Sequence, residues 1–157
     1  MPYIIDGDNL IGSSPDISLE DPDSRSKLVQ VVQKYQESRK NNITIVFDGA
    51  PQNGLLREDI RSKFSVVYPR ESSSADEEIK RILNGFHYFK DVTLITSDKE
   101  LKAFAKEKGA KTVSSIEFYF QLKRVSRYSG KVAETRKRID AELSDREVDQ
   151  WMKIFDE

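Results

Sequence analysis

The sequence predicts an α/β fold with a central, mainly parallel sheet of about five strands and helices on both faces. Short apolar, β-branched segments alternate with longer segments whose apolar residues recur at helical spacing. The chain of 157 residues is long enough for one sizeable core. We therefore expect a single domain over residues 1–157, with ligands bound beyond the carboxyl ends of the parallel strands.

Five segments have the composition of strands. The second, "ITIVF", is β-branched and nearly all apolar, as expected of a strand covered on both faces. The polar stretch 10–23 contains one glycine and two prolines and predicts a loop, and residues 51–62 predict a looser connection. The predicted strands lie at residues 3–5, 43–47, 64–68, 92–96 and 111–114.

Three helices are predicted between these strands. The first begins near Ser24 and carries apolar residues on one face through Lys40. The second follows Ser74, which can cap its first turn, and Glu77 three residues later can complete a capping box. The third ends at Gly109, because glycine readily adopts the backbone conformation that terminates a helix.

The last part of the chain is predicted to be helical and basic. A helix beginning at Ser115 continues into a basic helical segment, and together they span about 115–138. Residues 123–138 contain seven basic side chains and one acid. A second capping box, followed by apolar residues at i, i+3, i+4 and i+7, predicts an amphipathic helix over 144–156. The apolar face of the first of these helices is expected at Ile116, Tyr119, Phe120 and Val125.

Charge and cysteine content narrow the possible chemistry. The 26 basic and 27 acidic side chains leave a formal net charge of -1, so bulk charge predicts no polyanion partner. Without cysteine there is no disulfide and no thiolate metal site, so a metal would use oxygen ligands or His87. No apolar run approaches membrane-spanning length, and the first aspartate comes too early for a signal peptide. We expect a cytoplasmic protein with no membrane partner.

Four aspartates are expected at one edge of the sheet. Asp6, Asp48 and Asp98 follow three of the predicted strands, and Asp76 lies in the first turn of a helix that follows another. Because parallel strands end at the same edge, the four carboxylates would share a cleft and repel one another. A divalent cation would relieve this repulsion. Oxygen ligands favour Mg²⁺ or Mn²⁺, and such a site suits phosphodiester hydrolysis, with Asn9 orienting the phosphate or the attacking water.

Each of these aspartates also has an ordinary structural explanation. Asp6 and Asp48 precede glycines, as in common turns, Asp76 would compensate a helix N-terminus, and Asp98 would cap a helix. Such separate roles give no reason for all four acids to share an edge, whereas a metal site requires it. The joint pattern therefore favours a site.

The basic segment has two interpretations of similar weight. It is either a solvated helix face or a surface that contacts the phosphate backbone of a nucleic acid, and its density of arginine slightly favours the second. In that interpretation the RNA-binding residues are Lys123, Arg124, Arg127, Lys131, Arg136, Lys137 and Arg138.

Four motifs in a fixed order, "IIDGDNLIG", "IVFDG", "SSADEEI" and "LITSDKEL", resemble the NYN domain, in particular its bacterial YacP-like branch among the PIN-like nucleases. The branch opens with an apolar strand, Asp-Gly, a variable residue and Asn, matched here by Asp6, Gly7 and Asn9. The resemblance covers nearly the whole chain. One departure is Asp8 at the variable position, where uncharged residues are common. Its extra negative charge is expected to alter metal occupancy or to repel substrate.

The resemblance implies a PIN-like three-layer α/β/α sandwich that acts as a metal-dependent endoribonuclease on single-stranded RNA. It further implies a role in messenger RNA decay, with the ribosome as a candidate partner. By position, Asp6, Asp76 and Asp98 correspond to the site for Mg²⁺ or Mn²⁺, Asn9 to the signature asparagine, and Asp48 to a fourth acid.

Two other functions stay open. The motif "IIDGDNL" is also similar to that of haloacid-dehalogenase-like phosphatases, in which Asp6 would attack phosphate and Asp8 would serve as general acid. Against this, Leu10 stands where that motif requires threonine or valine. Alternatively, the chain is an RNA-binding or ribosome-associated module whose acidic cleft is catalytically inert.

Overall fold

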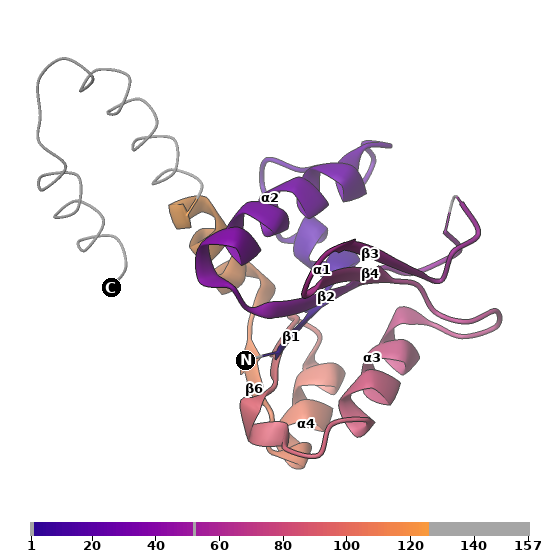
Figure 1. Cartoon of the computed structure of the whole chain (residues 1–157), viewed down its shortest axis with the longest axis vertical. Helices are drawn as coiled ribbons and strands as arrows, with labels where there is room; N and C mark the ends of the chain where they lie inside the picture. The colour runs from indigo at the N-terminus through magenta and orange to yellow at the C-terminus, as the bar shows by residue number, and fades with distance from the viewer. Residues whose placement is uncertain (1, 52, 126–157) are drawn as a thin grey trace, which may run out of the picture.

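A computed structural model describes residues 2–51 and 53–125, and within these ranges six strands form one sheet (Figure 1). Residues 115–125 form a helix that follows the last strand. In chain order the preceding elements are β1 (Pro2–Asp6), α1 (Gly7–Gly12), α2 (Ser24–Arg39), β2 (Asn42–Val46), β3 (Arg57–Arg61), β4 (Phe64–Val67), α3 (Ala75–Asn84), the 3-10 helix η1 (Phe89–Asp91), β5 (Thr93–Ile95), α4 (Lys99–Lys108) and β6 (Lys111–Val113).

The sheet has the order β3-β4-β2-β1-β5-β6, and every neighbouring pair is parallel except β3 with β4. The central position of β1 places Ile5 opposite both Ile45 of β2 and Ile95 of β5. The mainly parallel sheet is confirmed, but the described residues contain six strands instead of about five. The additional strand is β3, "REDIR", whose charged and mostly exposed side chains show no apolar alternation. Its pairing with β4 makes it a strand.

Two apolar cores lie on the two faces of the sheet. On one face, α1, α2 and the helical residues 115–125 cover strand residues that include Ile5 and Ile45. On the other face, α3 and α4 cover residues that include Ile4 and Val46. Figure 1 shows α2 on one side of the sheet and α3 and α4 on the other. The three-layer α/β/α arrangement is therefore confirmed.

The helix boundaries follow the predicted capping signals, with two corrections. The Ser74 side chain accepts a hydrogen bond from the Glu77 N–H at 3.2 Å, but the Glu77 carboxylate accepts from the Ser73 hydroxyl, so only half of the expected capping box forms. α4 ends at Gly109, whose φ of 91° is left-handed, as predicted. The expected loop after β1 begins with a helix, α1, because its six residues are too few to show a helical period.

The helix at residues 115–125 presents a partly different face to the core from the one expected. Val125 is buried and Tyr119 packs against the core as expected, and Phe118 and Leu122 are buried too, whereas Phe120 is 61% exposed and Ile116 is 41% exposed. The aromatic contacts of Phe118 with the β1 and α2 side chains select this face. The predicted helix over 144–156 lies outside the described residues, as does the basic segment beyond residue 125.

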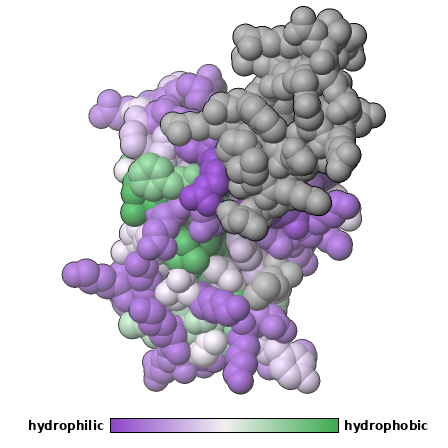
Figure 2. All heavy atoms as spheres, turned by 90° about the vertical axis from the view of Figure 1, so that its left-hand side faces the viewer, coloured by the Kyte–Doolittle hydropathy of each residue, from purple (hydrophilic) through white to green (hydrophobic). Residues whose placement is uncertain are grey.

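The face of the molecule drawn in Figure 2 is mostly hydrophilic and includes a smaller apolar area. Within residues 2–51 and 53–125, no helix has both the length and the apolar character needed to cross a bilayer.

Gly7 is required by close packing where β1 meets α1. A Cβ atom at this position would lie 2.5 Å from Cε1 of Phe47 and 2.9 Å from Cγ2 of Ile45, and both neighbours are fully buried. We expect Gly7→Ala to lower the free energy of unfolding by about 1–3 kcal/mol, because overpacking forces core side chains from their rotamers.

The matched control is Gly12→Ala at the other end of the same helix. A Cβ there would be 3.4 Å from the nearest atom, Cδ1 of Leu19, an ordinary contact. Urea denaturation of the two variants tests the assignment, and equal stabilities would contradict it.

Candidate active site

The structure brings the four predicted aspartates to the carboxyl edge of the sheet. Asp6 is the last residue of β1, Asp48 follows β2, and Asp98 follows β5 and caps α4. Asp76 is the second residue of α3, the helix reached from the carboxyl end of β4. The parallel strands therefore place these acids together as the sequence predicts.

Asp6 is the most deeply buried of the four acids. Its side chain is 7% exposed, and its Oδ2 accepts a hydrogen bond of 2.9 Å from the Thr96 hydroxyl. The pKa of Asp6 is raised from 3.8 to about 6; burial is the largest cause, the charges of Asp76 and Asp8 act in the same direction, and hydrogen bonds from Thr96 and the Asn9 backbone oppose them. The ionised form is therefore incompletely compensated by the described residues.

Asp76 links the aspartates electrostatically. Burial raises the pKa of its carboxyl, and the negative charge of Asp98 is the next largest cause, while Lys80 lowers it. Asp48 adds a smaller upward contribution. Because Asp76 also raises the pKa of Asp6, each of the other three aspartates is coupled to Asp76 by charge repulsion. This is the mutual repulsion that the sequence predicts.

Thr96 connects Asp6 with Asp98. Its hydroxyl donates to Asp6 and accepts a 3.1 Å hydrogen bond from the Asp98 N–H, and Thr96 is fully buried. Asp98 in turn caps α4, because its Oδ1 accepts from the N–H groups of Glu100 and Leu101 at 2.9 and 3.1 Å. The structural explanation for Asp98 is thus correct for one carboxylate oxygen, and Oδ2 has no hydrogen bond from the described residues.

Asp48 is exposed and ties β2 to α3. Its Oδ1 accepts from the N–H of Ala75, the first residue of α3, at 3.2 Å and from the N–H of Gly49 at 3.0 Å. This bond holds the start of α3, and with it Asp76, beside the end of β2. Asp48 therefore has a clear positioning role in addition to any chemical one.

Arg25 neutralises the additional acid, Asp8. Its guanidinium donates to both carboxylate oxygens of Asp8, at 3.2 and 3.1 Å, and to the backbone oxygen of Asp48 at 2.8 Å. Asp8 Oδ2 also accepts from the Asp48 N–H at 2.8 Å. The guanidinium lies 4.9 Å from the ring centroid of Phe47 and 5.9 Å from that of Tyr68. Arg25 thus compensates the additional negative charge of Asp8, although Asp8 still contributes to the raised pKa of Asp6.

Asn9 joins three segments through its side-chain oxygen. Oδ1 accepts a hydrogen bond from the Ser97 N–H at 2.9 Å and another from the Ser115 hydroxyl at 2.6 Å. Ser97 also accepts from the Ser115 N–H at 3.0 Å. The Asn9 amide nitrogen has no hydrogen-bond partner among the described residues and is free to donate.

The donor chemistry at the edge fits an oxygen-preferring divalent cation. Buried, mutually repelling carboxylates supply uncompensated negative charge, and Mg²⁺ typically takes only one or two carboxylates and completes its shell with water. Within the part of the chain that the structure describes, no three acidic or histidine side chains lie close enough to hold one ion together. The geometry therefore fits a pair of carboxylates better than a complete protein cage.

Two of the predicted RNA-binding residues lie within the described residues. Lys123 forms an ion pair with Asp16 and lies 5.7 Å from the ring centroid of Tyr119, so its charge is already partly compensated. Arg124 is exposed. Arg127, Lys131, Arg136, Lys137 and Arg138 lie outside the described residues.

The sequence analysis missed Thr96 and Arg25, which organise this edge. The hydroxyl of Thr96 is within the predicted strand "VTLIT", where its position before Ser-Asp is a weak signal of a capping role. Arg25 stands in a polar stretch at the start of α2, and nothing in the local sequence links it to Asp8, 17 residues away.

The chain is similar to known proteins in both sequence and fold. A family model described as the YacP-like NYN domain matches residues 3–156. "Uncharacterized protein YacP" from Bacillus subtilis (strain 168) is 29% identical over 85 residues, which cover 50% of this chain and 49% of that protein. The matched stretch thus spans about half of that relative's length.

Two crystal structures of Rae1 (YacP) from Bacillus subtilis are similar to this chain. One has a TM-score of 0.75 at 20% identity and covers 99% of this chain and 92% of its own. The other, a mutant, has a TM-score of 0.70 at 22% identity and covers 96% and 91%. At these identities the similarity shows a shared fold.

Replacing Arg25 tests whether the Asp8 pair holds this edge together. We expect Arg25→Ala to lower the free energy of unfolding by about 1–2 kcal/mol, because Asp8 loses its bidentate ion pair and Phe47 loses its cation–π contact. Lys27→Ala is the matched control on the same helix, since Lys27 pairs with Asp21 at the solvent-exposed surface, where an ion pair contributes little to stability. Equal losses in urea denaturation would contradict this assignment.

The raised pKa of Asp6 predicts a pH dependence of stability. The folded chain keeps the Asp6 proton up to about pH 6, whereas an unfolded aspartate loses it near its ordinary value of 3.8. Between these values the folded state binds more protons, so the metal-free protein loses stability as pH rises, by up to about 3 kcal/mol. Urea denaturation in EDTA between pH 4 and 7 should show this fall in the wild type and a shallower one in Asp6→Asn. Parallel curves for the two proteins would contradict the assignment.

Proposed function

Because the chain belongs to the YacP-like NYN domain family, we propose that it is a metal-dependent endoribonuclease that hydrolyses phosphodiester bonds in single-stranded RNA. The NYN family is generally one of ribonucleases, and membership gives the coarser assignment of a nuclease-like RNA-processing domain. The finer assignment rests on the chain's own residues. The observation that carries it is the buried carboxyl of Asp6, whose pKa is raised by burial and by the negative charge of Asp76.

The proposed metal-binding residues are Asp6, Asp76 and Asp98, of which two would bind the ion directly and the third through a water molecule, since no three acids lie close enough within the described residues to hold one ion together. NYN nucleases generally depend on divalent metals. When bound, Mg²⁺ or Mn²⁺ would lower the pKa of a water molecule and offset charge on the phosphate. The protein would contribute a cation-attracting edge, since neutralising Asp6 and Asp76 removes the repulsion between them. Asp98 has one oxygen available while the other caps α4.

Two further side chains would position the substrate. Hydrogen bonds from Ser97 and Ser115 to the Asn9 side-chain oxygen fix the orientation of the amide group. The amide nitrogen would then donate to a phosphate oxygen. Asp48 uses Oδ1 to hold α3, and its second oxygen can orient the attacking water. Messenger RNA as the substrate, a role in its decay and the ribosome as a partner are further parts of the proposal that rest on the family resemblance.

The phosphatase alternative finds no support in the environment of Asp8. A general acid needs a carboxyl that can hold a proton and reach the leaving group. Both oxygens of Asp8 instead accept hydrogen bonds, from Arg25 and from the Asp48 N–H. The catalytically inert RNA-binding module stays as the second candidate, because the exposed Asp48 and the capping role of Asp98 would also suit a structural edge.

Incubation with labelled single-stranded RNA and Mn²⁺ tests the nuclease proposal. We expect internal cleavage by the wild type and a loss of at least about 100-fold in Asp76→Asn, since losing even an indirect metal contact costs 10–100-fold. Asp91→Asn is the control, because it removes the same charge from the exposed helix η1, which precedes β5. Intact RNA with every metal would favour the inert module.

Thermal unfolding provides a separate readout of metal binding. Mn²⁺ should raise Tm in the wild type and in Asp91→Asn but not in Asp76→Asn, because a ligand that binds only the folded state stabilises it. The same shift in all three proteins would remove Asp76 from the metal site.

A further inference from the structure

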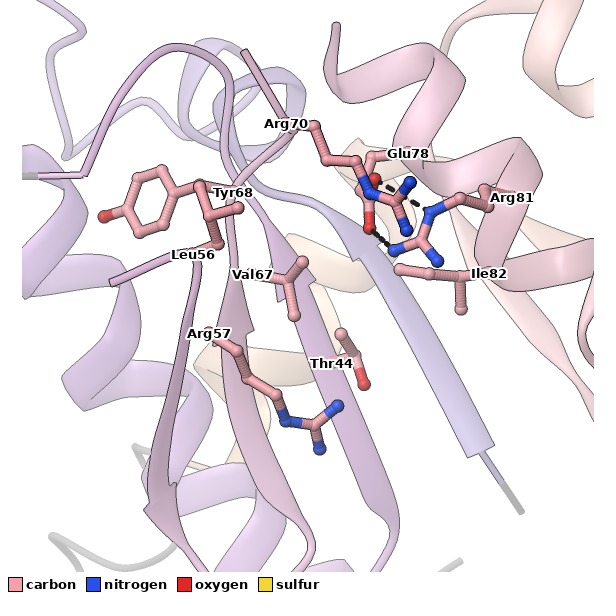
Figure 3. A pocket seen from close by; sticks show the side chains of 9 residues that line it. All are labelled: Thr44, Leu56, Arg57, Val67, Tyr68, Arg70, Glu78, Arg81 and Ile82. Carbon is pink, nitrogen blue, oxygen red and sulfur yellow. Dashed lines mark hydrogen bonds and ion pairs between the residues drawn. The ribbon is translucent and has the colours of Figure 1, made fainter. Parts of the chain in front are cut away.

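A pocket lined by three arginines lies beside α3, on the flank of the helix that faces β4 and β3 (Figure 3). We call it the arginine pocket and define it by Arg57, Arg70 and Arg81, with Glu78, Val67 and Ile82. Its volume is about 180 Å³. This is smaller than the roughly 300–1,000 Å³ typical of sites that enclose a whole small molecule. The pocket is thus the size of a subsite for one group of a longer ligand.

The arginine pocket contains more positive than negative charge. Its single acid, Glu78, is 3% exposed and accepts hydrogen bonds from Nε and Nη2 of Arg81, so this acid is already paired. Arg57 forms an ion pair with Asp59, and because the two side chains are 67% and 72% exposed, this pair contributes little. Arg70 has no acidic partner within residues 2–51 and 53–125.

The arrangement of these side chains suits a bound anion. Figure 3 shows the three arginines reaching the pocket from different elements, with Arg81 bonded to Glu78. Val67 and Ile82 add apolar lining. Guanidinium groups form paired hydrogen bonds with phosphate or carboxylate oxygens, so an anion held between them would gain several charged contacts.

The position of the pocket favours an RNA phosphate as that anion. α3 carries Asp76 in its first turn and Glu78 and Arg81 further along, and Arg70 lies in the connection from β4 to the same helix. The acidic edge and the arginine pocket are therefore neighbouring parts of one structure. A carboxylate cluster repels RNA and the net charge of -1 offers no general attraction, so a strand held at the acidic edge requires positive charge nearby.

We infer that the arginine pocket binds a backbone phosphate of single-stranded RNA next to the segment held at the acidic edge. The inference rests on the proposed function for the identity of the ligand, and it adds a substrate-binding site on a face of α3 that carries none of the predicted site residues. Arg70 and the weakly paired Arg57 supply the available positive charge. Arg81 is held in place by Glu78 and forms the fixed side of the pocket.

The test is RNA binding by the full chain with Arg57→Gln and Arg70→Gln combined. Both side chains are exposed and neither pairs with Glu78, so the substitutions leave the buried acid satisfied. We expect affinity for a fluorescent single-stranded RNA, measured by anisotropy in EDTA, to fall about tenfold or more. The plot of log affinity against log salt should become less steep by about 0.7, the value for one phosphate contact on a single strand.

The matched control is Lys34→Gln combined with Arg39→Gln, which removes the same two charges from the exposed surface of α2. Its affinity and salt slope should equal those of the wild type. If both double variants lose affinity equally, or if neither does, the pocket is overturned. No RNA binding by the wild type would overturn it as well.

These outcomes separate the pocket from the nuclease proposal. EDTA keeps the RNA intact, so binding is measured whether or not the chain cleaves RNA with Mn²⁺. Weakened binding only in the pocket variant supports the pocket even if cleavage is never observed. Unchanged binding in that variant overturns the pocket while a positive cleavage assay keeps the nuclease.

Chemical protection of the wild type gives a second test that needs no variant. Phenylglyoxal modifies accessible arginines, and peptide mass spectrometry measures its extent at each one. RNA in EDTA should protect Arg57 and Arg70 and leave Arg39 unchanged. Equal modification of Arg57 and Arg70 with and without RNA would overturn the pocket.

Discussion

The burial of a carboxylate at the end of the central strand constrains everything around it. β1 has parallel neighbours on both sides, and its last residue, Asp6, is almost completely enclosed. A buried charge is costly unless it is paired and hydrogen-bonded, yet Thr96 is its only side-chain partner among the described residues. The nearby carboxylate of Asp76 increases the cost. This edge of the sheet must therefore hold a proton or attract a cation. The proposed nuclease function rests on the second possibility.

Several hydrogen bonds hold the elements of this edge together. Asp8, Arg25 and Asp48 connect α1, α2 and β2, and Asp48 then holds the start of α3 through the Ala75 N–H. One consequence is that α3 presents Asp76 toward Asp6 and Asp98. Another is that Asp8, which as a bare charge would work against an anionic substrate, is compensated by a guanidinium. Asp8, Asp48 and Asp76 therefore have different roles, although all three are acids at the same edge.

α3 separates two regions of opposite charge. Its first turn carries Asp76 at the acidic edge, and its other flank carries Arg81 in the arginine pocket, where Glu78 fixes it. The proposed nuclease function needs such local separation in a chain of nearly zero net charge, because attraction for an RNA backbone and a cation-binding carboxylate cluster cannot occupy the same place. Helix geometry supplies it, because Glu78 and Arg81, three positions apart, share one side of α3, whereas Asp76 and Glu78, two positions apart, do not face each other.

The sequence by itself determined the parallel sheet, the capping residues Ser74 and Gly109, and the placement of four aspartates at one edge, because these depend on local composition and on the order of segments. Tertiary structure decided the rest. β3 exists through its pairing with β4, since its charged residues carry no strand pattern. Thr96 meets Asp6 across 90 residues of chain and Arg25 meets Asp8 across 17. Such partners are chosen by how the layers pack, which no local pattern of residues encodes.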